Sequence, residues 1–287
     1  MRPSELVLSS TGLPYHTHLG PGQLADNVIL VGDPARVTLF KQHLDHTTYE
    51  STNREMHALC GTYHGTPVTI LSTGMGCDNI DIVLTELEIA ANIDLATSRP
   101  LADRRHLRIV RIGTCGSLHA DLPCGSPVAS AYAVGMDGLL NYYQHDNSGF
   151  DTALEEAFCR HVTLDNRMAR PYAVAASRKL LQQVASDIPQ GITVTAPGFY
   201  APQGRHIRVT PTLEHLNDQL ATFQWNGLRI NNLEMETSGI YGMAQMYGHD
   251  ALTVCLVIAN RATGQFLTDY TDNIRQLIDR ILQRLVG

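Results

Sequence analysis

Short apolar runs alternate with amphipathic runs along most of this chain, and this alternation restricts the possible folds more than any other feature. NVILVGD (27–33) and YAVAAS (172–177) have the length and composition of buried strands. The amphipathic runs have helical spacing, and the last of them puts five aliphatic residues on one face: Ile274, Leu277, Ile278, Ile281 and Leu282. Strands that alternate with helices form a sheet that the helices cover. The sequence therefore predicts an α/β fold.

Further apolar segments along the chain indicate more strands. They are HALCGTYHGTPVTILST (57–73), which we interpret as a hairpin turning at His64–Gly65, and LRIVRIGTCGSL (107–118), GITVTA (191–196), LRINNLEME (228–236) and ALTVCLVIAN (251–260). A two-residue turn with glycine between two apolar runs is typical of a hairpin. We find no internal repeat and no convincing linker, so we expect a single domain of residues 1–287.

Composition and charge argue against several classes of protein. The net charge is −7 and no basic run occurs, so nothing favours a nucleic-acid partner. No apolar stretch reaches the roughly 18 residues that cross a bilayer, and the N-terminal residues lack the apolar core of a secretory signal. The six cysteines include no CxxC pair, which is typical of reduced thiols rather than disulfides or a zinc site. We expect a cytoplasmic protein with no metal site and no membrane partner.

The first candidate site follows the first strand, in VGDPARV (31–37). Asp33 is a helix-capping residue type and Pro34 suits the first helical position, so we expect a helix to begin there. Gly32 lets the backbone approach a ligand, and Arg36 lies one turn into the helix. Ligands of open α/β sheets bind beyond the carboxyl ends of strands, and these residues suit an anion. The alternative interpretation is a capped surface helix.

The second candidate site is RIGTCGS (111–117), where an arginine stands in an apolar strand. A buried arginine needs a partner, and the guanidinium fork of Arg111 matches two phosphate oxygens. Thr114 adds a hydroxyl group, and we expect a turn at Gly113 and Gly116 to add backbone amides. The alternative interpretation is a structural ion pair between Arg111 and an acidic neighbour.

The third candidate site is APGFYAPQGRHIRV (196–209), an extended segment rich in turn-forming residues. Phe199 offers a stacking face. Gln203 presents a donor and an acceptor, whereas Arg205 presents donors only. This set suits the edge of uracil, which has two carbonyl groups and one N–H. The alternative interpretation is a polar surface loop.

Two carboxylates flank one methionine in NNLEMET (231–237). Side chains of an extended segment alternate between faces, so Glu234 and Glu236 point the same way and Met235 points the other. Two like charges in an apolar setting are costly unless a partner or a ligand holds them. The alternative interpretation is a solvated strand end.

Taken together, these segments resemble the nucleoside phosphorylase family of the uridine phosphorylase type, over nearly the whole chain. Eight motifs occur in the family's order: HLG (18–20), VGDPARV (31–37), NRE (53–55), STGMG (72–76), RIGTCG (111–116), FYAPQGR (199–205), LEMET (233–237) and VIANR (257–261). The resemblance implies the nucleoside phosphorylase fold, a single α/β domain whose central mixed, partly barrel-like β-sheet is flanked by helices.

The resemblance also implies roles for individual residues. Phosphate would be held by Gly32, Arg36, Arg111, Thr114 and, from a neighbouring subunit, Arg54. Ribose would be held by Glu236 and Met235, with Glu234 beside them and His18 reaching in from that neighbour. The base would be held by Gln203 and Arg205, with Phe199 packed near it and Arg261 supporting Arg205.

The implied reaction is the phosphorolysis of uridine and related pyrimidine nucleosides. Phosphate, the co-substrate, attacks C1′ with inversion and gives uracil and α-D-ribose 1-phosphate, so no cofactor and no protein nucleophile are needed. We expect Arg111, Gln203, Arg205 and Glu236 to carry catalysis by stabilising charge as it develops. The resemblance implies a homo-oligomer, at least a dimer with shared active sites and, as among bacterial relatives, a hexamer built as a trimer of dimers.

The chain departs from some relatives at two places. Purine-cleaving relatives place an aspartate near the strand end where this chain has Ala259–Asn260, so the absence of that acid favours pyrimidines. Some relatives hold a monovalent cation near the position of Glu55, with a serine where this chain has Asn79. The asparagine argues against that cation here.

Three alternative functions stay open. A nucleosidase of the same superfamily uses water in place of phosphate, but Arg36, Arg54 and Arg111 argue against it because water needs no cluster of cations. A purine nucleoside phosphorylase and a non-catalytic nucleoside-binding protein are the others, since a fold does not fix a function. The sequence does not set a preference among uridine, deoxyuridine and thymidine.

Overall fold

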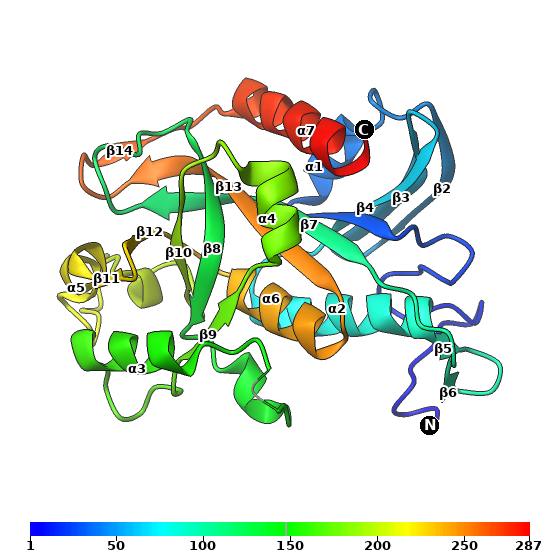
Figure 1. The fold of residues 1–287 in the computed structure, drawn as a ribbon, viewed down its shortest axis with the longest axis horizontal. Coiled ribbons are helices and arrows are strands. Elements are labelled where there is room, and N and C mark those ends of the chain that lie inside the picture. Colours follow the sequence, from blue (N-terminus) through cyan, green and yellow to red (C-terminus); the bar gives the residue numbers. More distant parts are fainter. Residues whose placement is uncertain (147) are drawn as a thin grey trace.

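One large mixed β-sheet organises the protein (Figure 1), whose computed structural model describes residues 1–146 and 148–287. Its strands pair in the order β11-β12-β10-β8-β13-β7-β1-β4-β3-β2, with β9 beside β8 and β14 beside β13. The strands are β1 (Asn27–Val31), β2 (His46–Asn53), β3 (Met56–Tyr63), β4 (Thr66–Ser72), β7 (Arg108–Ser117), β8 (Pro127–Gly135), β9 (Tyr172–Ala175), β10 (Gln190–Thr195), β11 (Gln224–Trp225), β12 (Leu228–Glu234), β13 (Asp250–Asn260) and β14 (Gln265–Phe266).

Helices and short segments complete the fold. The α-helices are α1 (Pro34–Leu39), α2 (Cys77–Asn92), α3 (Thr152–His161), α4 (Arg178–Ala185), α5 (Leu216–Thr222), α6 (Thr237–Met246) and α7 (Thr271–Val286). A separate two-stranded pair is formed by β5 (Ile93–Asp94) and β6 (Arg99–Pro100), and single turns of 3-10 helix are η1 (Leu139–Tyr142) and η2 (Ala201–Gln203). Within the described residues, no helix is both long and apolar enough to cross a membrane.

Five strands of the sheet close on themselves. β12 pairs with β10, β10 with β8, β8 with β13, and β13 with β7, and β7 returns to β12 through Gly116–Leu233 and Ser117–Asn232. β7 also pairs with β1, from which β4, β3 and β2 continue as an open sheet. The predicted α/β fold with a mixed, partly barrel-like sheet is confirmed.

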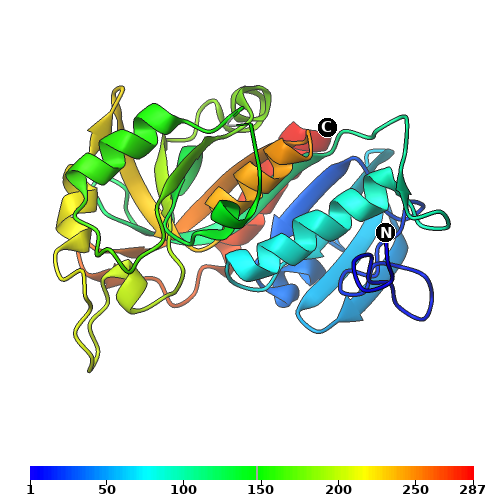
Figure 2. The same ribbon diagram turned by 90° about the horizontal axis from the view of Figure 1, so that it is seen from below.

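Helices cover the sheet from both sides (Figures 1 and 2). Apolar residues of α2 and α6 pack in one core cluster with β1 and β3, and those of α4 and α7 pack in another with β7 and β13. The predicted apolar face of the last helix is buried in the second cluster, as Ile274, Leu277, Ile278, Ile281 and Leu282. Because helices pack on both sides of the sheet, the positions of the strand ends that carry polar residues are fixed.

Two local predictions have opposite outcomes. The hairpin of β3 and β4 turns at His64–Gly65, where both residues have a left-handed φ, of 48° and 76°. The predicted turn at Gly113 and Gly116 is wrong, because β7 runs on to Ser117 and both glycines pair with β13. The strand can continue there because its neighbours on both sides supply backbone partners.

Candidate active site

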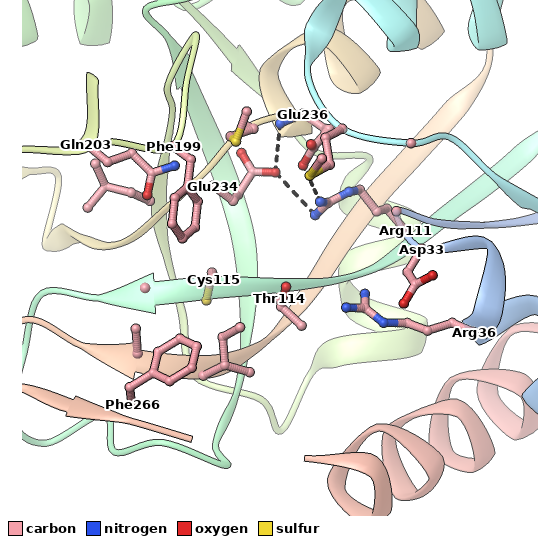
Figure 3. A pocket seen from close by; sticks show the side chains of 18 of the residues that line it. Asp33, Arg36, Arg111, Thr114, Cys115, Phe199, Gln203, Glu234, Glu236 and Phe266 are labelled. Atoms are coloured by element: carbon pink, nitrogen blue, oxygen red, sulfur yellow. Dashed lines mark hydrogen bonds and ion pairs between the residues drawn. The ribbon is translucent and has the colours of Figure 1, made fainter. Parts of the chain in front are cut away.

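A pocket of about 450 Å³ opens at the carboxyl ends of β1, β7, β12 and β13. Figure 3 shows Asp33 and Arg36 at one end, Phe199 and Gln203 at the other, and Arg111, Glu234 and Glu236 between them. The pocket thus brings together the four segments that the sequence singled out. The predicted site residues that line it are Gly32, Arg36, Arg111, Thr114, Phe199, Gln203, Arg205, Glu234, Met235 and Glu236.

Three predicted site residues do not line this pocket. Arg54 is exposed, in the two-residue turn between β2 and β3, and His18 is half-buried in the segment before β1. Arg261 lies behind the pocket wall, with its Nε 3.4 Å from the position that a Cβ on Gly116 would occupy. Arg54 and His18 therefore lie outside the pocket of their own chain.

The first end of the pocket is formed by the turn from β1 into α1. Asp33 caps the helix, with a carboxylate oxygen accepting from the Ala35 N–H at 2.9 Å. The guanidinium of Arg36 lines the pocket, and its Nη2 donates to the hydroxyl of Tyr270 at 3.4 Å. α1 has only 6 residues, so the positive charge of Arg36, rather than a helix dipole, is the attraction for an anion here.

Arg111 is the centre of the pocket's electrostatics. It is 3% exposed. Its Nη1 lies 3.2 Å from a carboxylate oxygen of Glu234 and 3.3 Å from Sγ of Cys255, and its Nη2 contacts Glu236. Burial alone would lower the pKa of Arg111, but Glu236, Cys255 and Glu234 together raise it. Arg111 therefore forms a structural ion pair and also lines the pocket, so the two interpretations that the sequence left open hold together.

The absence of a side chain at Gly113 makes this arrangement possible. A Cβ there would lie 2.0 Å from Nη1 of Arg111 and 2.9 Å from Sγ of Cys255, so the guanidinium and the thiol occupy the space above the glycine. The Nε of Arg111 is buried and has no hydrogen-bond partner among the described residues. Arg111 is thus held in place at the pocket wall by Glu234, Glu236 and Cys255.

The two glutamates differ in how fully their oxygens are used. Glu234 accepts from the hydroxyl of Thr195 at 2.7 Å, from the Glu236 N–H at 3.0 Å and from the Thr237 N–H at 3.0 Å. Glu236 accepts from the Gly76 N–H at 2.7 Å and from Arg111. Glu236 keeps more free lone pairs than Glu234, so Glu236 is the carboxylate better suited to accept from a ligand.

Burial and the nearby charge of Glu234 raise the pKa of Glu236, against the opposing attraction of Arg111. The two carboxylates contact one arginine, as predicted. The predicted strand alternation does not hold, because β12 ends at Glu234, Glu236 stands at the start of α6, and Met235 lines the same pocket. The solvated strand end, the alternative for this segment, is wrong because both side chains are buried.

The other end of the pocket is formed by the segment around η2. The guanidinium carbon of Arg205 lies 3.7 Å from the ring centroid of Phe199, and its Nη1 donates to Oε1 of Gln203 at 2.8 Å. Gln203 is buried, at 3% exposure, so the alternative of a freely solvated loop does not hold for this residue. Its amide nitrogen donates to no group within the described residues, which leaves that donor for a ligand.

Two guanidinium groups lie near this end without a carboxylate. Desolvation and then the charge of Arg261 lower the pKa of Arg205 to about 10, and two nitrogens of Arg261, Nε and Nη2, are buried and unpartnered in the described structure. Arg261 and Arg205 are therefore neighbours that repel each other, and the predicted support of one by the other is not a direct hydrogen bond. This end of the pocket attracts negative charge.

Asn260, near which the sequence interpretation expects an acid in a purine enzyme, does not line the pocket. Its Nδ2 donates to the carbonyls of His119 and Leu122 at 2.8 and 2.9 Å, and its Oδ1 accepts from the Thr263 N–H at 3.0 Å. All parts of its amide therefore hold the backbone together. Among the described residues no acid takes its place, since the acidic residues that line the pocket are Asp33, Glu55, Glu234 and Glu236.

The sequence interpretation missed several residues of the site. Cys255 contacts Arg111, the Gly76 N–H binds Glu236, and Ile258 and Phe266 form an apolar wall. The two glycines of STGMG before a helix were a usable signal for the Gly76 contact. Cys255 and Ile258 gave no signal, because each looks like an ordinary member of an apolar strand.

This chain belongs to the phosphorylase superfamily, whose family model matches residues 26–286. It is similar to the uridine phosphorylase of Thermococcus kodakarensis, at 28% identity over 269 residues that cover 92% of this chain and 83% of that protein. It is also similar to a DeoD-type purine nucleoside phosphorylase of Caldanaerobacter subterraneus, at 29% identity over 253 residues that cover 86% and 89%.

Among solved structures, this chain is similar to a nucleoside phosphorylase of Trypanosoma brucei, whose crystal structure is described as showing uridine phosphorylase activity. The TM-score is 0.86 at 26% identity, with 98% of both chains covered. The resemblance read from the eight motifs is therefore confirmed for the family.

Proposed function

We propose that this protein is a uridine phosphorylase, which converts uridine and phosphate to uracil and α-D-ribose 1-phosphate. One observation carries the choice of base: the end of the pocket at Gln203 and Arg205 is cationic, and its lining holds no acid there. A departing uracil spreads negative charge over its two carbonyl oxygens, which guanidinium and amide donors stabilise. A departing purine is helped instead by an acid that protonates a ring nitrogen.

The pocket supports a direct displacement at C1′. Phosphate would bind at Arg36, Thr114 and Arg111, which line this end of the pocket. A phosphate oxygen forms the new bond to C1′ from below the sugar ring. The bond from C1′ to N1 breaks with its electron pair moving into uracil, and C1′ is inverted. The phosphate charge and the base-end donors stabilise the two charges of the transition state.

We assign the ribose diol to Glu236. Its carboxylate lies between the two ends of the pocket and keeps lone pairs free for the 2′- and 3′-hydroxyls. Glu234 is assigned the task of holding Glu236 and Arg111 in place, because its own oxygens are taken up by Thr195, Thr237 and Arg111. Met235 would pack against the sugar.

We also propose that a second copy of the chain completes each active site. The charge of Arg111 is shared with two carboxylates, so Arg36 is the main uncompensated cation that a phosphate dianion would meet. A further cation would help, and Arg54 is exposed at the tip of a hairpin whose next residue, Glu55, lines the pocket. A reciprocal exchange of Arg54 and His18 needs a two-fold dimer. The expected larger assembly is a hexamer built from three such dimers.

Uridine and inosine assays, each with and without phosphate, test this function. We expect uracil release that rises with phosphate, ribose 1-phosphate as the second product, and little turnover of inosine. Free ribose formed equally without phosphate would identify a nucleosidase instead. Inosine turnover as fast as uridine turnover would identify a purine enzyme, and uridine binding without turnover a binding protein.

A further inference from the structure

The turn that carries His18 is fastened to helix α2 by one buried carboxylate. Glu86 is 6% exposed and accepts from the His16 N–H at 3.0 Å and from the Thr17 N–H at 2.7 Å. Nδ1 of His16 lies 2.7 Å from the same carboxylate. Figure 2 shows the N-terminal segment beside α2. A buried carboxylate is costly unless it is fully paired, and Glu86 finds its partners in this turn.

Strand β2 holds the other side of the same turn. The hydroxyl of Tyr49 donates to the carbonyl of His18 at 2.8 Å. Nδ2 of Asn53 donates to the carbonyls of Tyr15 and His16 at 3.0 and 3.1 Å. Asn53 immediately precedes Arg54, so the turn with His18 and the hairpin tip with Arg54 form one connected unit.

The backbone conformation of both residues needs this support. His18 and Arg54 each have a left-handed φ of 53°, which is unfavourable for residues other than glycine. Such conformations persist where the surrounding contacts impose them. The contacts of Glu86, Tyr49 and Asn53 therefore support the backbone around two residues that do not line their own chain's pocket.

We propose that Glu86 is a positioning residue that acts in trans: it fixes the unit that presents His18 and Arg54 to the partner subunit's active site. This inference rests on the proposed shared site. The carboxylate accepts charge-assisted hydrogen bonds from two successive backbone N–H groups, which fixes the path of the chain rather than one side chain. Residues that are positioned before a substrate arrives need no ordering when the substrate binds.

Glu86→Gln tests the role of this carboxylate with little change of shape. The amide group replaces one acceptor with a donor that faces the N–H groups of His16 and Thr17. We expect kcat/KM for uridine to fall by about 10- to 100-fold, the effect of a misplacement of about 1 Å away from the chemistry, with no phosphate-independent activity gained. Glu88→Gln is the matched control, because Glu88 lies on the same helix but contacts His249 and Asn92.

Mixed dimers separate an effect in trans from a general loss of structure. Arg36→Ala removes a pocket residue that is only half-buried, so its chain should keep an intact Glu86 unit. After dissociation and reassembly with Glu86→Gln chains, each mixed dimer has one site built from an unmutated pocket and an unmutated unit. Since half of the dimers are mixed, activity should recover to about a quarter of that of the parent.

The outcomes of this experiment distinguish the inference from the function on which it rests. A parallel mixture of Arg54→Ala with Arg36→Ala reports on the shared site itself. Recovery in that mixture but not with Glu86→Gln, with subunit exchange confirmed by mass, would overturn the role of Glu86 alone. Recovery in neither mixture would overturn the shared site as well. A loss of activity in Glu88→Gln equal to that in Glu86→Gln would also overturn the positioning role.

Discussion

Nη1 of Arg111 lies 3.2 Å from Oε2 of Glu234 inside the pocket, and Nη2 of the same guanidinium contacts Glu236. The arginine is thus already paired within the protein, at the place where phosphate and ribose are expected to meet. Arg111 contacts Glu236, which is the proposed acceptor for the ribose diol. Arg111 therefore links the expected phosphate site to the expected ribose site.

Removal of the guanidinium at the base end should reduce catalysis strongly. Arg205→Ala leaves a uracil carbonyl unpaired, so we expect a loss of about 2 to 4 kcal/mol in transition-state stabilisation, or roughly 30- to 1000-fold in kcat/KM for uridine. Steady-state kinetics measure it. Arg208→Ala is the control, because Arg208 is exposed on the same segment and does not line the pocket. Equal effects of the two changes would contradict the assignment.

Replacement of Glu236 should affect ribonucleosides most. Glu236→Gln keeps the shape but turns a charged acceptor into a neutral amide, and charged hydrogen bonds are about twice as strong as neutral ones, so a loss of about 1 to 3 kcal/mol is expected with uridine. The loss should be smaller with 2′-deoxyuridine, which lacks one of the hydroxyls. Kinetics on both substrates measure the difference, and an identical penalty would leave the contact with the 2′-hydroxyl without support.

Replacement of Glu234 should instead reduce stability. Glu234→Gln places an amide group opposite the N–H groups of Glu236 and Thr237, and a buried unsatisfied donor costs about 1 to 3 kcal/mol. Unfolding in urea measures the change, and Glu88→Gln provides a comparison on a less buried carboxylate. A stability loss in Glu236→Gln as large as that in Glu234→Gln would show that the two glutamates share the structural task.

The dependence of activity on pH should report on Glu236. Burial and Glu234 raise its pKa, so the acid limb of kcat/KM for uridine should begin above the pH expected from an ordinary glutamate pKa of about 4.3. Glu236→Gln should remove that limb. The sign for stability is opposite to that of an acid whose pKa is lowered in the folded state. A carboxyl group with a higher pKa in the folded state stabilises folding at low pH, and that contribution is lost as pH rises through the folded pKa.

Measurements of kcat/KM and of the free energy of unfolding between acid and neutral pH, on the parent and on Glu236→Gln, test both statements. An acid limb that persists unchanged in the variant would assign the titration to another group. A parent that gains stability relative to the variant as pH rises would reverse the proposed direction of the pKa.

Mixed dimers of Arg54→Ala and Arg36→Ala test the sharing of the site. Each variant alone should be nearly inactive, because each lacks one phosphate contact. The mixture should recover about a quarter of the parental activity, since half of the dimers are mixed and each contains one complete site. If activity does not recover although mass measurement confirms exchange, Arg54 acts in its own chain's site or in none.

Much of the fold followed from local patterns. The strand at 27–33, the hairpin at His64–Gly65 and the apolar face of the last helix were each visible, because hydrophobic periodicity and turn chemistry are properties of neighbouring residues. β8 (Pro127–Gly135) was missed, although it pairs with both β10 and β13. Its small residues, such as Ala129 and Ala131, gave no strong strand pattern. The turn expected at Gly113 and Gly116 failed for a related reason, since glycine suggests a turn unless strands on both sides supply partners.

The sequence by itself determined which side chains could do chemistry: an arginine within an apolar strand, two carboxylates two residues apart, and a glutamine beside an arginine. Only the tertiary structure decided their tasks. Glu234 and Glu236 look alike in the sequence, yet one has its oxygens filled by Thr195 and Thr237 while the other keeps acceptors free. The reason is physical. A residue type fixes which hydrogen bonds a side chain can make, but which of them are already made depends on groups that lie far apart in the chain and meet only when the sheet closes.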